Sequence, residues 1–177
     1  MRPLSYFVAS SLDGFIARVD GGIDWLFTDA DYGYTEFYAS VDALVLGRAT
    51  FDLAMSFPEY PYPGKQAYVF SSTRKESPRP DVRFVAEDPV GFVRRLKSEP
   101  GKKIWLVGGS RLAAPLLAAE EVDELVVSIH PVTIGRGVPL FPAREGESRW
   151  RLVSSASFPS GLAQLTYALA EGARRSP

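Results

Sequence analysis

The chain has 177 residues, of which 46% are hydrophobic and 23% charged, and its formal net charge is −1. The length predicts a single domain over residues 1–177, with a frayed GARRSP tail, and the composition is typical of a globular protein. The near-neutral charge gives no electrostatic case for binding nucleic acid or an anionic membrane surface. The lack of cysteine excludes a disulfide, a thiolate metal site and a cysteine nucleophile, and we expect no metal site.

The N-terminal segment does not resemble a signal peptide, because it carries one positive charge and a short apolar stretch that serines interrupt. No apolar run approaches the ~20 residues that a membrane-spanning helix needs. We therefore expect a cytoplasmic protein.

Strand and helix patterns alternate along the chain. Strands are expected where short runs of apolar, aromatic or branched residues occur, at 4–10, 43–46, 66–71, 83–86, 104–107 and 124–129. Helices are expected at 29–40, from Thr50 onward, at 89–98 and at 110–119. The segment SLDGFIARVDGGIDWL is expected to be a loop, because it contains three turn glycines.

The repeated order of apolar strand and helix predicts parallel strands that are covered on both faces. After Pro131 the pattern changes, because the segments 151–157 and 161–170 have no helix between them. These segments are expected to pair as a terminal hairpin. The predicted fold class is α/β, with a mixed, mostly parallel central sheet, helices on both faces and an antiparallel C-terminal hairpin.

Two expected strands end in a glycine turn that opens a helix. The first turn lies in DALVLGRATFD at Gly47, and the second lies in KKIWLVGGSRLAAPLL at Gly108 and Gly109. Such a turn leaves unpaired backbone N–H groups at the positive end of a helix, which suits a phosphate. Two such turns predict a diphosphate held from both sides, as in a dinucleotide cofactor. The alternative is that the glycines only relieve steric crowding.

The motifs SLDGFIA, GGIDWL, LGRATF, VFSST, IWLVGGSRLAAPLL and VDELVVSIHPVTIGRGVPLF follow one another in this order. This order resembles the dihydrofolate-reductase fold. It is most similar to the C-terminal reductase domain of the riboflavin-biosynthesis deaminase-reductase and to the stand-alone relatives of that domain. The resemblance covers roughly residues 4–170, and no segment resembles the zinc-binding deaminase half.

The resemblance implies a site for NADPH. The counterparts of two groups of residues surround the cofactor diphosphate, namely Gly47, Arg48 and Thr50 in the first turn and Gly108, Gly109, Ser110, Arg111 and Leu112 in the second. The counterparts of Ala9 and Ile16 contact the nicotinamide. The loop of Ser71, Ser72 and Thr73 surrounds the adenosine ribose, and Arg74 and Lys75 beyond it could take the 2′-phosphate. The alternative for this loop is an ordinary solvated turn.

The resemblance also implies substrate contacts. Asp31 lies near the position of the acidic residue that holds the substrate in dihydrofolate reductases, but the surrounding DADYGYTEF departs from that pattern. Asp31 is therefore a candidate catalytic residue or a solvated acid at a helix start. Asp13, Trp25 and Arg136 are candidates for binding substrate. The alternatives are that Asp13 and Arg136 only belong to turns and that Trp25 is an aromatic residue of the core. His130, the only histidine, is expected to be structural or peripheral.

Together these features predict an NADPH-dependent reductase of a small heterocycle. The best match is the reduction of 5-amino-6-(5-phosphoribosylamino)uracil in riboflavin synthesis. One alternative is dihydrofolate reductase, and another is a dinucleotide-binding protein without turnover, because the cofactor motifs are better matched than the substrate acid. The resemblance also implies a homodimer.

Overall fold

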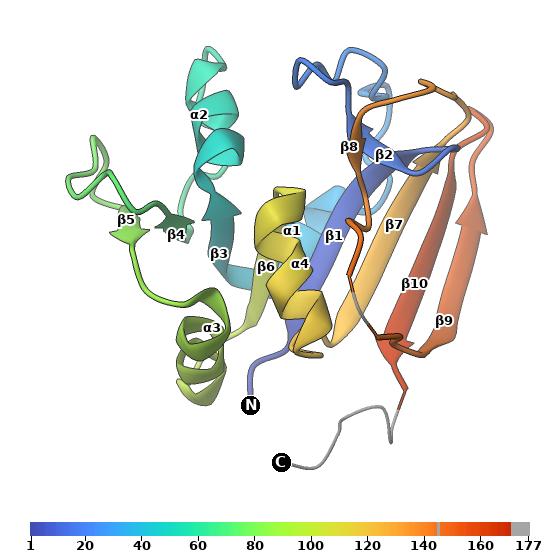
Figure 1. Ribbon diagram of the computed structural model, residues 1–177. Coiled ribbons are helices and arrows are strands. Elements are labelled where there is room, and N and C mark those ends of the chain that lie inside the picture. The colour runs from blue at the N-terminus through green and yellow to red at the C-terminus, as the bar shows by residue number, and fades with distance from the viewer. Residues whose placement is uncertain (145, 171–177) are drawn as a thin grey trace.

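The computed structural model describes residues 1–144 and 146–170 and is organised around one eight-stranded sheet (Figure 1). The strand order is β5-β4-β3-β6-β1-β7-β10-β9. The strands are β1 Leu4–Ser11, β3 Val41–Gly47, β4 Gln66–Phe70, β5 Val82–Val85, β6 Lys103–Gly108, β7 Glu124–His130, β9 Trp150–Ser157 and β10 Ala163–Leu169. The pairings from β5 to β7 are all parallel, whereas β10 runs antiparallel to both β7 and β9.

Helices cover both faces of this sheet. The helices are α1 Tyr34–Ser40, α2 Arg48–Ser56, α3 Pro89–Ser98 and α4 Ser110–Ala118. On one face, Phe37 of α1 and Phe51 of α2 share a buried cluster with Trp105 of β6. On the other face, Phe92 of α3 and Leu116 of α4 share a cluster with β1. Since neighbouring residues of a strand point to opposite faces, strands β1, β3, β4, β5 and β6 each contribute to both clusters. The predicted fold class is therefore confirmed.

Helix α3 shows why its boundaries were predictable. Asp88 accepts a hydrogen bond from the Gly91 N–H at 2.7 Å, so its side chain caps the helix. Pro89 follows in the first turn, where its missing N–H leaves no helix bond unmade. The predicted range of 89–98 agrees with the structure.

Three predicted details are wrong. The first helix begins at Tyr34 instead of residue 29, because Tyr32 and Gly33 have left-handed backbone angles, with φ of 49° and 78°. The last strand begins at Ala163 instead of residue 161, because Gly161 (φ 87°) belongs to the hairpin turn. The predicted loop after β1 contains the strand β2 Phe15–Ala17, which pairs with β8 Val138–Pro139 as a second, two-stranded antiparallel sheet.

Within residues 1–144 and 146–170, no helix has both the length and the apolar character that crossing a bilayer would require. The expected fraying of the GARRSP tail concerns residues outside those ranges.

The face covered by α3 and α4 provides a test of the core. Leu116 is fully buried in α4, so Leu116→Ala is expected to lower the free energy of unfolding by about 2–5 kcal/mol. Leu53→Ala in the exposed part of α2 is the matched control and should cost no more than about 1 kcal/mol. Urea unfolding measures both values, and equal losses would contradict this description of the core.

A candidate cofactor cleft and substrate cavity

The predicted cofactor segments lie together at the carboxyl ends of adjacent parallel strands. Gly47 ends β3 and Gly108 ends β6, and the ladder pairs Leu46 with Gly108. On the other side of β3, Gly47 pairs with Phe70, the last residue of β4, which Ser71 follows. Open parallel sheets bind ligands outside the carboxyl ends of their strands, so this edge is where a cofactor site is expected.

The two glycine turns approach each other closely. A Cβ atom on Gly109 would lie 3.3 Å from Thr50 Oγ1, and one on Gly47 would lie 3.4 Å from the Gly109 nitrogen. Gly108 has a φ of 130°, which side chains rarely allow, and its peptide bond to Gly109 is cis. The two turns and Thr50 therefore form a single backbone-lined cradle that side chains at these glycines would fill.

Both helices that follow the turns begin at this cradle. The N-cap of α2 is Gly47 and that of α4 is Gly109, and a glycine has no side chain to accept the first helical N–H groups. The helices lie on opposite faces of the sheet. Arg48 and Arg111 are exposed in their first turns, and Ser110 is buried. Two positive helix ends and two cations fit a diphosphate between them.

The loop after β4 is a turn organised by Ser71. The buried Ser71 Oγ accepts a hydrogen bond from the Arg74 N–H at 3.2 Å, whereas Ser72 and Thr73 are exposed. The Arg74 guanidinium donates to Asp52 of α2 at 2.6 Å. The exposed hydroxyls and Arg74 thus lie at the end of the cradle that β4 borders.

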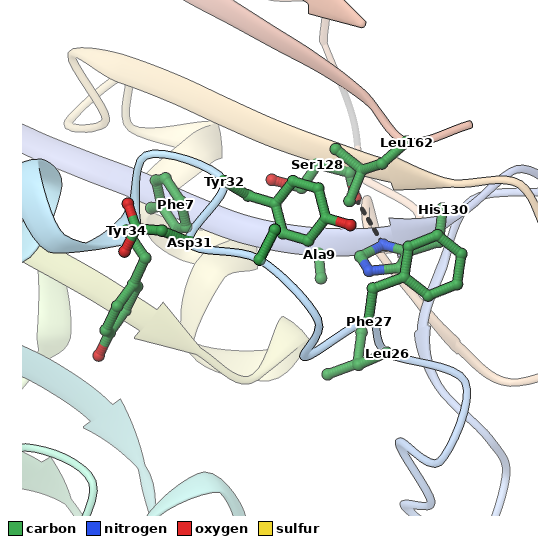
Figure 2. Close-up of a pocket in the computed structure, with 11 residues that line it drawn as sticks. Phe7, Ala9, Leu26, Phe27, Asp31, Tyr32, Tyr34, Ser128, His130 and Leu162 are labelled. Atoms are coloured by element: carbon green, nitrogen blue, oxygen red, sulfur yellow. Dashed lines mark hydrogen bonds between the residues drawn. The ribbon is translucent and has the colours of Figure 1, made fainter. Parts of the chain in front are cut away.

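A cavity of about 300 Å³ lies beside the ends of β1 and β7, on the face that α1 covers. Figure 2 shows Asp31 and Tyr34 toward one end and Phe27 with His130 toward the other. Its wall is formed by Phe7, Ala9, Leu26, Phe27, Ala30, Asp31, Tyr32, Tyr34, Ser128, His130 and Leu162. Among the predicted site residues, only Ala9 and Asp31 line it.

Asp31 is both a cavity residue and a helix-start acid. Its carboxylate accepts hydrogen bonds from the Thr35 hydroxyl at 2.5 Å and from the Thr35 N–H at 3.0 Å. The Thr35 hydroxyl and then the Thr35 backbone N–H lower the pKa of Asp31. The side chain is exposed at the cavity wall and carries a negative charge at neutral pH.

His130 lies in the cavity wall and is not peripheral. Its side chain is 3% exposed, Nδ1 lies 3.2 Å from the Ser128 carbonyl oxygen, and the rings of Trp25 and Phe27 meet it edge-on. Burial lowers the pKa of His130, so the imidazole is neutral at pH 7. The expectation of a structural residue agrees with these contacts. The ring nevertheless also forms part of the candidate site.

The side chain of Gln164 links two parts of the cavity wall. The Gln164 amide donates to the Tyr32 carbonyl oxygen and to Ser128 Oγ, each at 3.0 Å. It thereby joins the loop before α1 to β7. Phe7 and Ser128 could have been found from the alternation of β1 and β7, which places them on the faces of Ala9 and His130. Nothing local in the sequence identifies Tyr32 or Leu162.

The other predicted site residues lie around the cavity and do not line it. Trp25 is buried behind His130. Ile16 belongs to β2 and packs against the cluster on the α3 and α4 face. Arg136 is exposed in the loop before β8. The structure therefore does not bring Trp25 and Arg136 together with Asp31.

Asp13 links the turn between β1 and β2 to the loop before β8 by hydrogen bonds. Its carboxylate accepts hydrogen bonds from the Gly135 N–H at 2.7 Å, the Ile134 N–H at 3.1 Å and the Ser11 hydroxyl at 2.6 Å. The Ser11 hydroxyl contributes most to lowering the pKa of Asp13, and the two backbone N–H groups add to it. These bonds hold the loop before β8 against the turn between β1 and β2. These contacts agree with the alternative expectation that Asp13 belongs to a turn.

The fold and the paired glycine turns define a dihydrofolate-reductase-like protein of the riboflavin-pathway reductase type. The sequence matches the RibD C-terminal domain family over residues 2–164, and the chain belongs to that family. The resemblance seen in the sequence is thereby confirmed.

Three known proteins illustrate the relationship. The uncharacterized protein YwjB of Bacillus subtilis (strain 168) is 37% identical over 170 residues, which cover 94% of this chain and 97% of that protein. A candidate riboflavin biosynthesis protein from Shewanella sp. PV-4 is 30% identical, with a TM-score of 0.85 and coverage of 97% of this chain and 100% of the other. Dihydrofolate reductase from Enterococcus faecalis, complexed with NADP(H), shares the fold at 20% identity with a TM-score of 0.72, covering 96% and 97%.

The neutral state of His130 has a measurable consequence. A histidine pKa that is lower in the folded chain than in the unfolded one makes stability fall as pH drops below the unfolded value of about 6.5. We expect the wild type to lose stability between about pH 7.5 and about pH 5.5, where no other side chain of ordinary pKa titrates. His130→Asn, which can keep a donor to the Ser128 carbonyl, should lose less. Urea unfolding at the two pH values tests this, and an equal loss would contradict it.

Proposed function

We propose that this protein is an NADPH-dependent reductase of a small nitrogen heterocycle related to the aminouracil of the riboflavin pathway. The observation that carries the proposal is that the glycine cradle and the aromatic cavity lie along one edge of the sheet. The order of strands β4, β3, β6, β1 and β7 places the Ser71 loop first, the cradle next and the cavity last. This sequence of sites fits the adenosine, the diphosphate and the nicotinamide of a dinucleotide, with the substrate beyond.

The residues present fit such a cofactor. Helices α2 and α4 begin at Gly47 and Gly109 without a side-chain cap, so their first-turn backbone N–H groups are left for a phosphate. Ala9 lines the cavity and belongs to β1, the strand next to β6. Its small side chain would leave room for the nicotinamide ring between the cradle and the cavity. When bound, NADPH would supply a hydride and leave as NADP⁺.

The protein would contribute orientation and exclusion of water. The aromatic rings of Phe7, Phe27 and Tyr34 offer flat apolar surfaces to a planar substrate. The ionised Asp31 can accept a hydrogen bond from a ring or exocyclic N–H group. Reduction of a C=N bond adds the hydride to carbon and a proton to nitrogen, and we assign that proton to water because Asp31 is ionised and His130 is neutral at pH 7.

Dihydrofolate is a second candidate substrate, because Asp31 lies in the cavity wall where a pterin ring could pair with it. Activity with dihydrofolate that an antifolate blocks and that Asp31→Asn removes would favour this alternative.

The proposal includes a homodimer. β9 is an edge strand, and Leu152 and Val153 on it are 51% and 53% exposed. A long edge strand with exposed apolar side chains, on which Arg151 is the one charged residue, favours pairing with another chain. Sedimentation equilibrium would measure the mass in solution.

The cradle provides the first test of cofactor binding. Gly109→Ala would place a methyl group 3.3 Å from Thr50 Oγ1, so the dissociation constant for NADPH is expected to rise about tenfold or more. Gly91→Ala in α3 is the matched control and should leave the constant unchanged. Titration of NADPH against tryptophan fluorescence measures both. Saturable binding that both variants retain would show that the cradle is not the site, and absence of NADPH binding by the wild type would end the proposal.

The loop after β4 provides the test of cofactor preference. Arg74→Gln is expected to weaken NADPH binding about tenfold while changing NADH binding little, because only NADPH carries the 2′-phosphate. Arg83→Gln, which removes an exposed cation from β5, is the control. Equal effects of Arg74→Gln on both cofactors would place the 2′-phosphate elsewhere.

A further inference from the structure

The charge of the cavity differs from what a phosphorylated substrate would need. Of the residues that line it, only Asp31 carries a charge at neutral pH. Burial lowers the pKa of His130 and keeps it neutral, and burial raises the pKa of Tyr34. Among residues 1–144 and 146–170, the lining therefore contributes a negative charge and contains neither lysine nor arginine.

The arginines on the loops nearby are engaged or lie outside the wall. Arg18 forms a two-point ion pair with Asp24, at 2.7 and 3.0 Å. Arg136, which the sequence suggested as a substrate-binding residue, is exposed and is not part of the lining. A phosphate monoester carries about −1.5 to −2 charges at pH 7 and is bound by charge-assisted donors, which this wall does not offer.

The same wall suits a planar ring with N–H groups. Eight of its members are aromatic or aliphatic, and they are Phe7, Ala9, Leu26, Phe27, Ala30, Tyr32, Tyr34 and Leu162. Asp31 holds one carboxylate beside them, with its Oδ1 bonded to Thr35. An ionised carboxylate next to aromatic surfaces attracts a neutral or protonated heterocycle that donates N–H bonds, and it repels an anion.

We propose that the cavity selects a planar, N–H-donating heterocycle without a phosphate group, so that the substrate of this chain is unphosphorylated. This inference rests on the proposed function, and it separates this chain from a reductase that requires the phosphoribosyl form. The reaction class that supplies the substrate would accordingly release or never attach a phosphate ester.

The test compares two ligands that differ only in the phosphate. The probes are 5-amino-6-(ribosylamino)uracil and its 5′-phosphate, titrated by calorimetry into wild-type protein saturated with NADP⁺, so that no turnover occurs. We expect the unphosphorylated form to bind more tightly than the phosphate, by up to about tenfold. Equal or tighter binding of the phosphate would overturn the inference, as would failure of both forms to bind.

Variants show which charge sets the preference. Asp31→Asn is expected to weaken binding of the unphosphorylated form about tenfold and to affect the phosphate less, because the loss of an N–H acceptor is offset by relief of repulsion. Glu36→Gln removes one exposed negative charge from the first turn of α1 and is the matched control. Equal effects of Asp31→Asn and Glu36→Gln would overturn the role assigned to Asp31.

Arg136→Ala tests whether Arg136 binds the phosphate group of the ligand. It should change neither titration. A loss of phosphate binding in this variant would mean that Arg136 reaches a phosphate at the cavity, and the inference would then be wrong. Binding of NADPH is measured separately. Normal NADPH binding with a preference for the phosphate would therefore refute only this inference, whereas absence of NADPH binding would refute the proposed function.

Discussion

The close approach of the ends of β3 and β6 is the constraint on which the candidate site depends. The two strand ends are so close that a Cβ atom on Gly47 would lie 3.4 Å from the Gly109 nitrogen. Thr50 of α2 closes the same gap from the other face of the sheet. Because two helices from opposite faces begin there, their positive ends converge on one space. Either turn alone would be an ordinary strand-to-helix connection, and the ladder between β3 and β6 makes them one site.

The rest of the structure holds that edge in place. Trp105 of β6 donates from Nε1 to the Phe7 carbonyl oxygen at 3.0 Å, and Phe7 stacks on Phe37 with the ring centroids 4.4 Å apart. The same Phe7 side chain forms part of the cavity wall. The core under α1 and the substrate cavity therefore share a residue, so that packing of the core also orients the wall. At the other end, Asp13 and the β2–β8 pair fix the loops beside β1.

Much of the fold and the close approach of the two glycine turns could be predicted from the sequence, because both depend on local patterns. A continuous apolar strand, a glycine turn and a helix occur within about fifteen residues in each half of the cradle, and the register of a parallel sheet then brings the halves together. The cap at Asp88 and Pro89 is equally local. Helix α1 was predicted too long because the left-handed angle at Tyr32 belongs to a residue that rarely adopts it.

The cavity could not be predicted in the same way, because its wall comes from segments far apart in the chain. Tyr32 stands in the wall because Gln164, 132 residues later, bonds to its carbonyl oxygen, and because the Tyr32 hydroxyl donates to Ser160. His130 was expected to be structural or peripheral at the end of a strand, yet Trp25 from the predicted loop and Phe27 just after it pack against its ring. Such contacts depend on how loops pack and leave no periodic signal in the sequence.

This contrast between the two sides has a chemical meaning. The candidate cofactor cleft is built from backbone and turns, which suit a diphosphate because that group is the same in every dinucleotide. The cavity is built from side chains on loops, where single substitutions alter charge and shape without disturbing the sheet. One carboxylate, a neutral imidazole and a ring of aromatic side chains make this particular wall unfavourable for an anion. Under the proposed function, membership of the family would therefore constrain the cofactor more tightly than the substrate, and the charge of the wall would decide which heterocycle enters.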